Sequence, residues 1–150
     1  MQQRELGQAQ TPISAIGYGA MSFSDFYGPT DDAKSFAILD RCMDLGITHL
    51  DTSNVYGLGL SEQRIGAYLK QRGQQARDFF TIATKAGIAS KPDGSRYFNN
   101  SPEHLRKELD GSLQRLGVEQ VELLYVHRRD ASVPIEEVAQ SLAELVKSGK

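Results

Sequence analysis

Four polar side chains lie at or near the ends of predicted strands, and their types suit a proton-donating site. Asp51 comes at the end of one short apolar run, and Tyr56 lies on the loop that follows it. Lys85 ends the next predicted strand, and His127 ends the one after that. Because the carboxyl ends of parallel strands lie on the same face of a sheet, we expect the four side chains to meet.

The chemistry of these four residue types fits carbonyl reduction. An unperturbed tyrosine has a pKa of about 10, too high for easy proton donation near neutral pH. A nearby lysine ammonium favours the phenolate form of a tyrosine, and a carboxylate paired with the lysine keeps it charged and in place. A histidine beside them can hydrogen-bond a substrate carbonyl oxygen and orient it. The set contains no nucleophile with an adjacent base, so it suits acyl transfer poorly.

Each of the four residues, taken alone, also has a plainer interpretation. Asp51 would be a turn former after a strand, and Tyr56 a packing residue on a loop held open by glycines. Lys85 would be a solvated lysine, and His127 a hydrogen-bonded histidine at a sheet edge. The catalytic interpretation therefore depends on the strand ends lying in register.

Hydrophobic periodicity and capping residues predict strands that alternate with helices. The predicted order is a hairpin over residues 4–14, a strand over 15–21, a helix over 32–45, a strand over 47–50, a helix from 61 to 72, a strand over 79–85, a long loop over 86–100, a helix from 102 to 116, a strand over 121–126 and a helix from 135. The long loop contains a predicted turn at Lys91-Pro92-Asp93-Gly94. This alternation predicts a parallel sheet covered by helices, either doubly wound or closed into a barrel.

Composition narrows the class of protein. The chain has 150 residues, of which 39% are hydrophobic and 24% charged, and its net charge of -2 gives no reason to expect nucleic acid or an anionic membrane as partner. The first residues lack the apolar core of a signal peptide, and the single cysteine, Cys42, has no internal disulfide partner. These features predict a protein of the reducing cytoplasm. His49, His104 and Cys42 are assigned structural positions, so no metal site is predicted.

Several short motifs spread over nearly all of the chain are specific. They are Leu50-Asp51-Thr52-Ser53 with Tyr56-Gly57, Thr81-Ile82-Ala83-Thr84-Lys85, Ser101-Pro102-Glu103-His104-Leu105 with Ser112-Leu113-Gln114-Arg115-Leu116-Gly117, and Leu124-Tyr125-Val126-His127-Arg128. Together they resemble the N-terminal half of an aldo-keto reductase. The form His127-Arg128-Arg129-Asp130 is similar to the branch described as auxin-induced-type or pyridoxal reductases.

The resemblance implies an α/β fold of the (β/α)8 TIM-barrel type, which binds NADPH without a Rossmann domain. It implies Tyr56 as general acid, Lys85 and Asp51 as its tuning pair, and His127 as the residue that orients a small-molecule carbonyl substrate. The family's first barrel strand contacts the nicotinamide end of the cofactor, which implies Gly19, Ala20 and Met21 here, with Asp51 beside them.

A complete barrel of this family needs a chain roughly twice as long. We therefore expect residues 1–150 to form an N-terminal hairpin and the first four strand–helix units, a half barrel whose C-terminal half lies outside the chain. Such a piece is expected to be inactive alone and to self-associate through its open edges. Ile16, Leu50, Ile82 and Leu124 are expected to contribute exposed apolar surface.

Two other functions stay open at this point. One is a regulatory NADPH-binding protein of the same fold, similar to channel β-subunits. The other is a non-catalytic half barrel that associates with itself. Turnover of a simple aldehyde separates a reductase from both.

Overall fold

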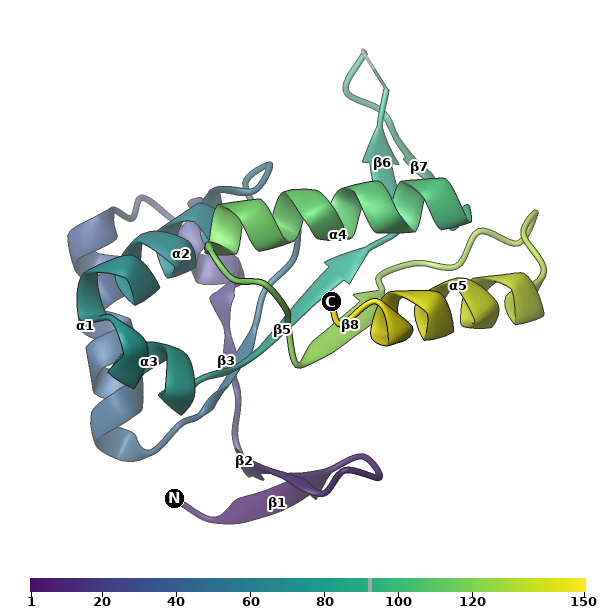
Figure 1. Cartoon of the computed structure of the whole chain (residues 1–150). Coiled ribbons are helices and arrows are strands. Elements are labelled where there is room, and N and C mark those ends of the chain that lie inside the picture. The colour runs from purple at the N-terminus through teal and green to yellow at the C-terminus, as the bar shows by residue number, and fades with distance from the viewer. Residues whose placement is uncertain (92) are drawn as a thin grey trace.

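The computed structural model, which describes residues 1–91 and 93–150, contains a hairpin followed by four strand–helix units (Figure 1). The parallel sheet has the strand order β3 (Tyr18–Gly19), β4 (His49–Asp51), β5 (Thr81–Ala86) and β8 (Leu123–Val126). Each strand is thus paired with the next parallel strand along the chain. A doubly wound sheet would reverse its order at a switch point, whereas a barrel keeps it. The predicted half barrel is confirmed, with β3 and β8 at the two ends of the described sheet.

The helices begin and end where capping chemistry places their ends. They are α1 (Asp32–Leu45), α2 (Leu60–Arg72), α3 (Gln74–Phe79), α4 (Pro102–Leu116) and α5 (Ile135–Lys147). The side chain of Asp31 accepts a hydrogen bond from the backbone N–H of Lys34, and that of Ser101 accepts one from His104. Gly46 and Gly117 end α1 and α4 in the left-handed conformation. None of the helices in the described part of the chain is both long enough and apolar enough to cross a membrane.

The core lies between the sheet and its helices. Its members include Leu50 and Ile82 from the sheet, Leu39 and Cys42 from α1, Ile65 and Tyr68 from α2, and Leu109, Leu113 and Leu116 from α4. The expectation that Leu50 and Ile82 would be exposed is wrong, because their side chains face the helices and are fully buried. Ile16 is exposed but precedes β3, and Leu124 is partly buried.

Two hairpins lie at opposite ends of the sheet (Figure 1). The first, β1 (Gln3–Leu6) with β2 (Thr11–Ser14), confirms the predicted leading hairpin and lies at the amino ends of the strands. The Ser14 hydroxyl oxygen accepts a hydrogen bond from the backbone N–H of Thr48, just before β4. The second, β6 (Ile88–Ser90) with β7 (Arg96–Phe98), follows the carboxyl end of β5.

That second hairpin replaces the structureless loop expected over 86–100. The backbone N–H of Gly94 bonds the carbonyl of Lys91, as a turn there requires, while Pro92 lies outside the described residues. The base of the hairpin is closed by a bond of 3.0 Å from the Asn99 N–H to the Gly87 carbonyl. Ile88 in β6 and the aromatic residues Tyr97 and Phe98 in β7 are typical of strands, but the turn residues between them favoured a loop.

The bounds of other predicted strands also differ from the structure. The strand expected over 15–21 is shortened to Tyr18–Gly19, because the chain then enters a 3-10 turn (Ala20–Ser24) that buries Phe23 in the core. Phe79 belongs to the short helix α3, not to a strand, since a new helix begins at Gln74 and the chain pairs with β4 only from Thr81.

In α5, the buried face is narrow. Ile135 is 50% exposed and Val146 75% exposed, although both are apolar. Val138, Ser141 and Leu145 form the buried stripe. Val146 lies about 100° around the helix from Leu145, so it points away from that stripe.

Close contact between α2 and α4 depends on Gly66. A methyl group added at Gly66 would overlap the carbonyl oxygen of Arg115 and lie 2.9 Å from that of Leu116. We predict that Gly66→Ala destabilises the protein by about 1–3 kcal/mol, because backbone atoms cannot move aside as a side chain can. Urea unfolding followed by circular dichroism measures the change.

Gly111→Ala in α4 is the matched control for that substitution. Its new methyl group would meet only the flexible end of the Arg115 side chain, 3.1 Å away. Higher helix propensity should make this variant neutral or more stable by up to about 1 kcal/mol. Equal destabilisation by both substitutions would contradict the role assigned to Gly66.

Candidate active site

Lys85 lies at the centre of the predicted cluster. Its ammonium donates to Asp51 Oδ1, to the carbonyl oxygen of Thr52 at 2.8 Å and to the hydroxyl oxygen of Tyr56 at 3.1 Å. A lysine ammonium has three hydrogens, so each has an acceptor. Because the Tyr56 oxygen accepts from Lys85, the hydroxyl hydrogen of Tyr56 is left to donate to another group.

The strand register places Asp51 and Lys85 together. Asp51 pairs with Ala83, two residues before Lys85 on the neighbouring strand. Side chains two apart on a strand share a face, so Asp51 and Lys85 point the same way. The Thr52 N–H extends the pairing by bonding the Ala83 carbonyl at 2.9 Å.

The loop that carries Tyr56 is held at both of its ends. The buried hydroxyls of Thr52 and Ser61 lie 2.8 Å apart, and Ser61 also donates to the carbonyl of Ala20 at 2.8 Å. Gly57 has a φ of 61° and approaches so closely that an added Cβ would lie 2.8 Å from Cβ of Ser24. Only glycine meets both demands without strain, so Gly57 fixes the direction in which Tyr56 leaves the loop.

A buried ion pair supports β5 directly behind Lys85. Glu62 is fully buried and accepts from Thr84 Oγ1 at 2.5 Å and from Arg115 Nε at 2.6 Å. These contacts connect α2, α4 and β5. Sequence reasoning used Glu62 only as a helix start. Its partner Arg115 lies 53 positions away, so no local pattern revealed the pair.

His127 lies beside Tyr56, directly after β8. Its ring centroid is 6.0 Å from that of Tyr56, and the two planes meet at 82°. Its Nδ1 is 3.2 Å from the Ser53 hydroxyl. Partial burial lowers the pKa of His127 from its usual value, and the positive charges of Lys85 and Arg128 lower it further. The imidazole is therefore neutral at neutral pH.

The Ser53 hydroxyl has a choice of two acceptors. It lies 3.2 Å from His127 Nδ1 and 3.2 Å from Oδ1 of Asn54, whose own amide group donates to Glu108 Oε2 at 2.7 Å. When Ser53 donates to Nδ1, the hydrogen of the neutral imidazole must sit on Nε2. The choice that Ser53 makes between its two acceptors therefore links the tautomer of His127, through Asn54 and Glu108, to α4. Sequence reasoning included Ser53 in a motif but gave it no role.

The residues expected at the cofactor occupy the end of β3 and the turn after it. Gly19 is paired with Asp51 on the adjacent strand, and among the described residues no atom beyond its own chain neighbours lies within 4 Å of the position that a Cβ on Gly19 would occupy. The side chain of Ala20 is fully buried, and Met21 lines the cleft described next. The structure therefore brings Asp51, Tyr56, Lys85 and His127 together, with open space beside Gly19.

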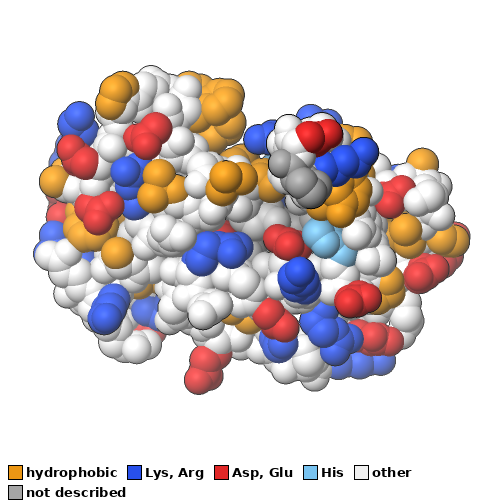
Figure 2. Space-filling view, turned by 90° about the horizontal axis from the view of Figure 1, so that it is seen from above, with side chains coloured by type: hydrophobic (Ala, Val, Ile, Leu, Met, Phe, Trp, Pro, Cys, Tyr) orange, Lys and Arg blue, Asp and Glu red, His pale blue; other side chains and the backbone are white. Residues whose placement is uncertain are grey.

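A cleft of about 630 Å³ opens over Tyr56 and His127. Its other walls come from the turn and loop after β3, the loop of Tyr56, the β6–β7 hairpin and the loop after β8; they include Met21, Ser24, Phe26, Leu58, Arg96, Phe98 and Arg128. Seen from above, hydrophobic side chains gather beside a notch in the outline, with Lys or Arg side chains close by (Figure 2).

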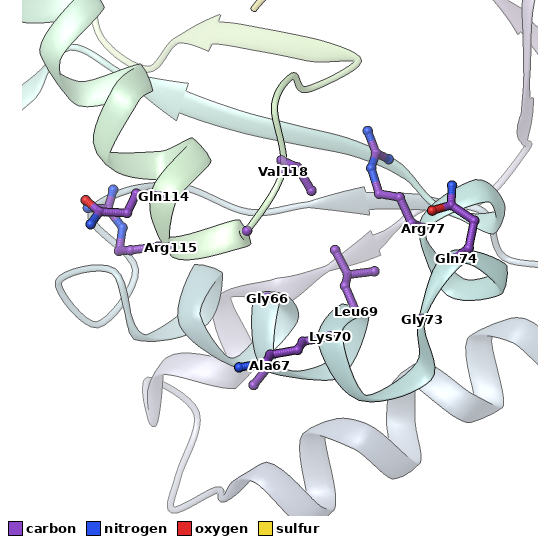
Figure 3. Close-up of a pocket in the computed structure, with 11 residues that line it drawn as sticks. Gly66, Ala67, Leu69, Lys70, Gly73, Gln74, Arg77, Gln114, Arg115 and Val118 are labelled. Atoms are coloured by element: carbon purple, nitrogen blue, oxygen red, sulfur yellow. The ribbon is translucent and has the colours of Figure 1, made fainter.

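A second hollow, of about 500 Å³, lies on the outer helical surface between α2, α3 and the end of α4 (Figure 3). Lys70, Arg77 and Arg115 line it, and none of the four predicted catalytic residues does. His49 and His104 line neither hollow.

Comparison with known proteins agrees with this geometry. The sequence model of the Aldo/keto reductase family matches residues 15–150. The chain belongs to the aldo-keto reductase family. It is 39% identical over 148 residues to the aldo-keto reductase yakc (NADP+) of Schizosaccharomyces pombe, covering 98% of this chain and 42% of that protein. It is 37% identical to L-glyceraldehyde 3-phosphate reductase of Escherichia coli, covering 100% of this chain and 43% of that protein.

Solved structures show the same relationship. An aldo-keto reductase from Bacillus halodurans, in its holo form, matches with a TM-score of 0.84 and 32% identity, over 99% of this chain and 47% of that one. The chain thus spans about two fifths of the curated relatives and about half of the matched structure. Its fold is that of the TIM-barrel aldo-keto reductases.

The neutral state of His127 leads to a pH prediction. We expect an NMR titration of its ring to have a midpoint below the ordinary value of 6.5, because burial and the nearby cations disfavour the charged form. Between the folded midpoint and 6.5, the unfolded chain binds more protons than the folded one. Folding stability should therefore fall as the pH falls through that window.

Lys85→Met removes one of the positive charges that lower the pKa of His127, so it should move the titration midpoint of His127 upward. Lys107→Met, an exposed substitution on α4, is the control and should leave it in place. A wild-type midpoint above 6.5 would contradict the environment described for His127.

Proposed function

We propose that this chain carries the proton-donating site of an NADPH-dependent reductase of aldehydes or ketones. The observation that carries the proposal is the Lys85 ammonium, whose three hydrogens all have acceptors, one of them the Tyr56 hydroxyl oxygen at 3.1 Å. The substrate is a small carbonyl compound bound in the cleft over Tyr56 and His127. No nucleic acid or membrane takes part in the reaction.

The residues of the chain divide the work between orientation and proton transfer. Nε2–H of neutral His127 donates a hydrogen bond to the substrate carbonyl oxygen and orients it, which requires Ser53 to donate to Nδ1. Tyr56 then gives its proton to that oxygen as negative charge develops there. The phenolate left on Tyr56 is stabilised by the Lys85 ammonium, and Asp51 holds that ammonium in place.

NADPH fits beside this cluster and supplies the hydride when bound. The open space next to Gly19 allows a ring to approach the backbone there, and Gly19 is paired with Asp51 in the sheet. We propose that Gly19, Met21 and Asp51 contact the nicotinamide end of the cofactor, while Ala20, which is fully buried, supports the turn between Gly19 and Met21. The name of the fission-yeast relative includes NADP+, which supports this choice of cofactor.

Tyr56→Phe, made in the protein expressed from its full reading frame, tests the proposed acid. Loss of the hydroxyl removes the proton donor but leaves the cofactor contacts in place, so kcat for a simple aldehyde should fall by at least about a hundredfold. The dissociation constant of NADPH, measured by fluorescence, should change little.

Tyr97→Phe is the matched control for Tyr56→Phe, because Tyr97 lies on β7 and does not line the cleft. Turnover of Tyr56→Phe within tenfold of wild type would exclude this role. Wild-type protein that binds NADPH but reduces no aldehyde would instead favour a regulatory protein of the same family.

Lys85→Met and Asp51→Asn separate the two members of the tuning pair. Removing the ammonium deprives the phenolate of its stabilising charge, so Lys85→Met should cost about as much in kcat as Tyr56→Phe. Asp51→Asn removes only the partner that positions the ammonium, and it should cost less. Steady-state kinetics at saturating NADPH measure which variant loses more kcat. A larger loss for Asp51→Asn than for Lys85→Met would overturn this division of roles.

A further inference from the structure

The charge of the cleft wall carries information about the substrate, provided that the proposed reductase function holds. Among the described residues that line the cleft, the charged side chains are Arg96 and Arg128, and no carboxylate is present. The remaining wall is apolar or aromatic, apart from the hydroxyls of Ser24 and Tyr56 and the imidazole of His127. Asp51, the carboxylate of the cluster, is already paired with Lys85.

The two arginines also differ from the other arginines near the core. Arg64, Arg72, Arg77 and Arg115 each lie within 4.0 Å of a carboxylate. Within residues 1–91 and 93–150, neither Arg96 nor Arg128 has such a partner. Their guanidinium groups keep their hydrogen-bonding capacity for a ligand.

Ordered backbone holds both arginines at the cleft. Arg96 is paired with Ser90 across the β6–β7 hairpin. The carbonyl of Arg128 accepts from the side chain of Asn100 at 3.0 Å, and Asn100 is fully buried and also binds the N–H of Asp130 at 2.6 Å. One arginine therefore comes from the hairpin and the other from the loop after β8, with Asn100 fixing that loop.

The positive charge of both arginines reaches the reacting end of the cleft. Each of them lowers the pKa of His127, after the larger effects of burial and Lys85, while Asp51 acts in the opposite direction. A substrate that binds between the arginines and His127 thus meets a predominantly positive potential. A cationic substrate would be disfavoured, and an anionic one attracted.

We propose that the substrate is a carbonyl compound that carries an anionic group, a phosphate or a carboxylate. Arg96 and Arg128 bind that group while the carbonyl faces Tyr56 and His127. Guanidinium groups suit this role because they present paired N–H donors that match two oxygens of either anion. The apolar walls supplied by Phe26 and Phe98 contact the carbon skeleton between the two ends.

Matched pairs of aldehydes test the proposal on the protein made from its full reading frame. Glycolaldehyde phosphate is compared with glycolaldehyde, and 4-carboxybenzaldehyde with its methyl ester. We expect kcat/KM to favour at least one anionic member by about tenfold or more, the effect of a charge-assisted hydrogen bond. The first pair reports on phosphate and the second on carboxylate.

Arg96→Gln and Arg128→Gln should each remove most of that preference by raising KM for the anionic aldehyde more than for its neutral partner. Arg129→Gln is the control, because Arg129 is exposed next to Arg128 and does not line the cleft. It should leave the preference unchanged.

The outcomes separate the two proposals. Turnover of neutral aldehydes without preference for the anionic ones would overturn the anion site and leave the reductase function standing. A loss of NADPH affinity in the arginine variants, with no change in aldehyde preference, would show that the arginines bind cofactor phosphate instead. Failure to reduce any of the four aldehydes would contradict the proposed function itself. Arg96→Lys and Arg128→Lys keep the charge, and partial retention of the preference in them would exclude a folding defect.

Discussion

The ammonium of Lys85 is the point on which the site depends, because it has three hydrogens and all three are used. One holds the carboxylate of Asp51, one holds the carbonyl of Thr52 and one reaches the hydroxyl of Tyr56. Satisfying all three at once demands that β4, β5 and the Tyr56 loop keep fixed relative positions. A displacement of any of them would leave a partly buried charge without a partner, which is costly. The same interaction that arranges the chemistry therefore also constrains the sheet.

The packing behind the sheet meets that demand. Glu62 receives hydrogen bonds from Thr84, the residue before Lys85, and from Arg115 of α4. The carbonyl oxygen of Arg115 is also the atom that leaves no room for a side chain at Gly66 of α2. The close packing of α2 against α4 and the Glu62–Arg115 ion pair thus both support the end of β5 next to Lys85. The position of Lys85 is therefore supported from the side of the sheet opposite to the cleft.

The order of the strands and helices, and the meeting of the polar strand ends, could be predicted because both depend on short sequence patterns. Asp31 and Ser101 cap the starts of α1 and α4, and a glycine follows the end of each. Each of these residues lies next to the helix end that it determines. Alternating strands and helices implied that polar strand ends share a face, which predicted that Asp51, Lys85 and His127 would meet.

The features that were missed depend on contacts between residues that are not neighbours in the sequence. The β6–β7 hairpin needs cross-strand pairing, the shortened β3 depends on burying Phe23, and Ser53, Glu62 and Glu108 act through residues far along the chain. Leu50 and Ile82 were placed on the correct strands, but the side of the sheet that they face was not anticipated.

The closed base of the β6–β7 hairpin has an evolutionary consequence. The chain leaves the barrel at Gly87 and returns at Asn99, and one backbone hydrogen bond joins the two points. Residues between them can be exchanged, lengthened or shortened with little disturbance to β5 or α4, because loops with adjacent ends tolerate such change. The hairpin contributes Arg96 and Phe98 to the cleft, whereas the residues of the proposed proton-donating site lie on the strands and their own loops. Natural variation in this one segment can therefore change the lining of the cleft while the cluster around Lys85 is preserved.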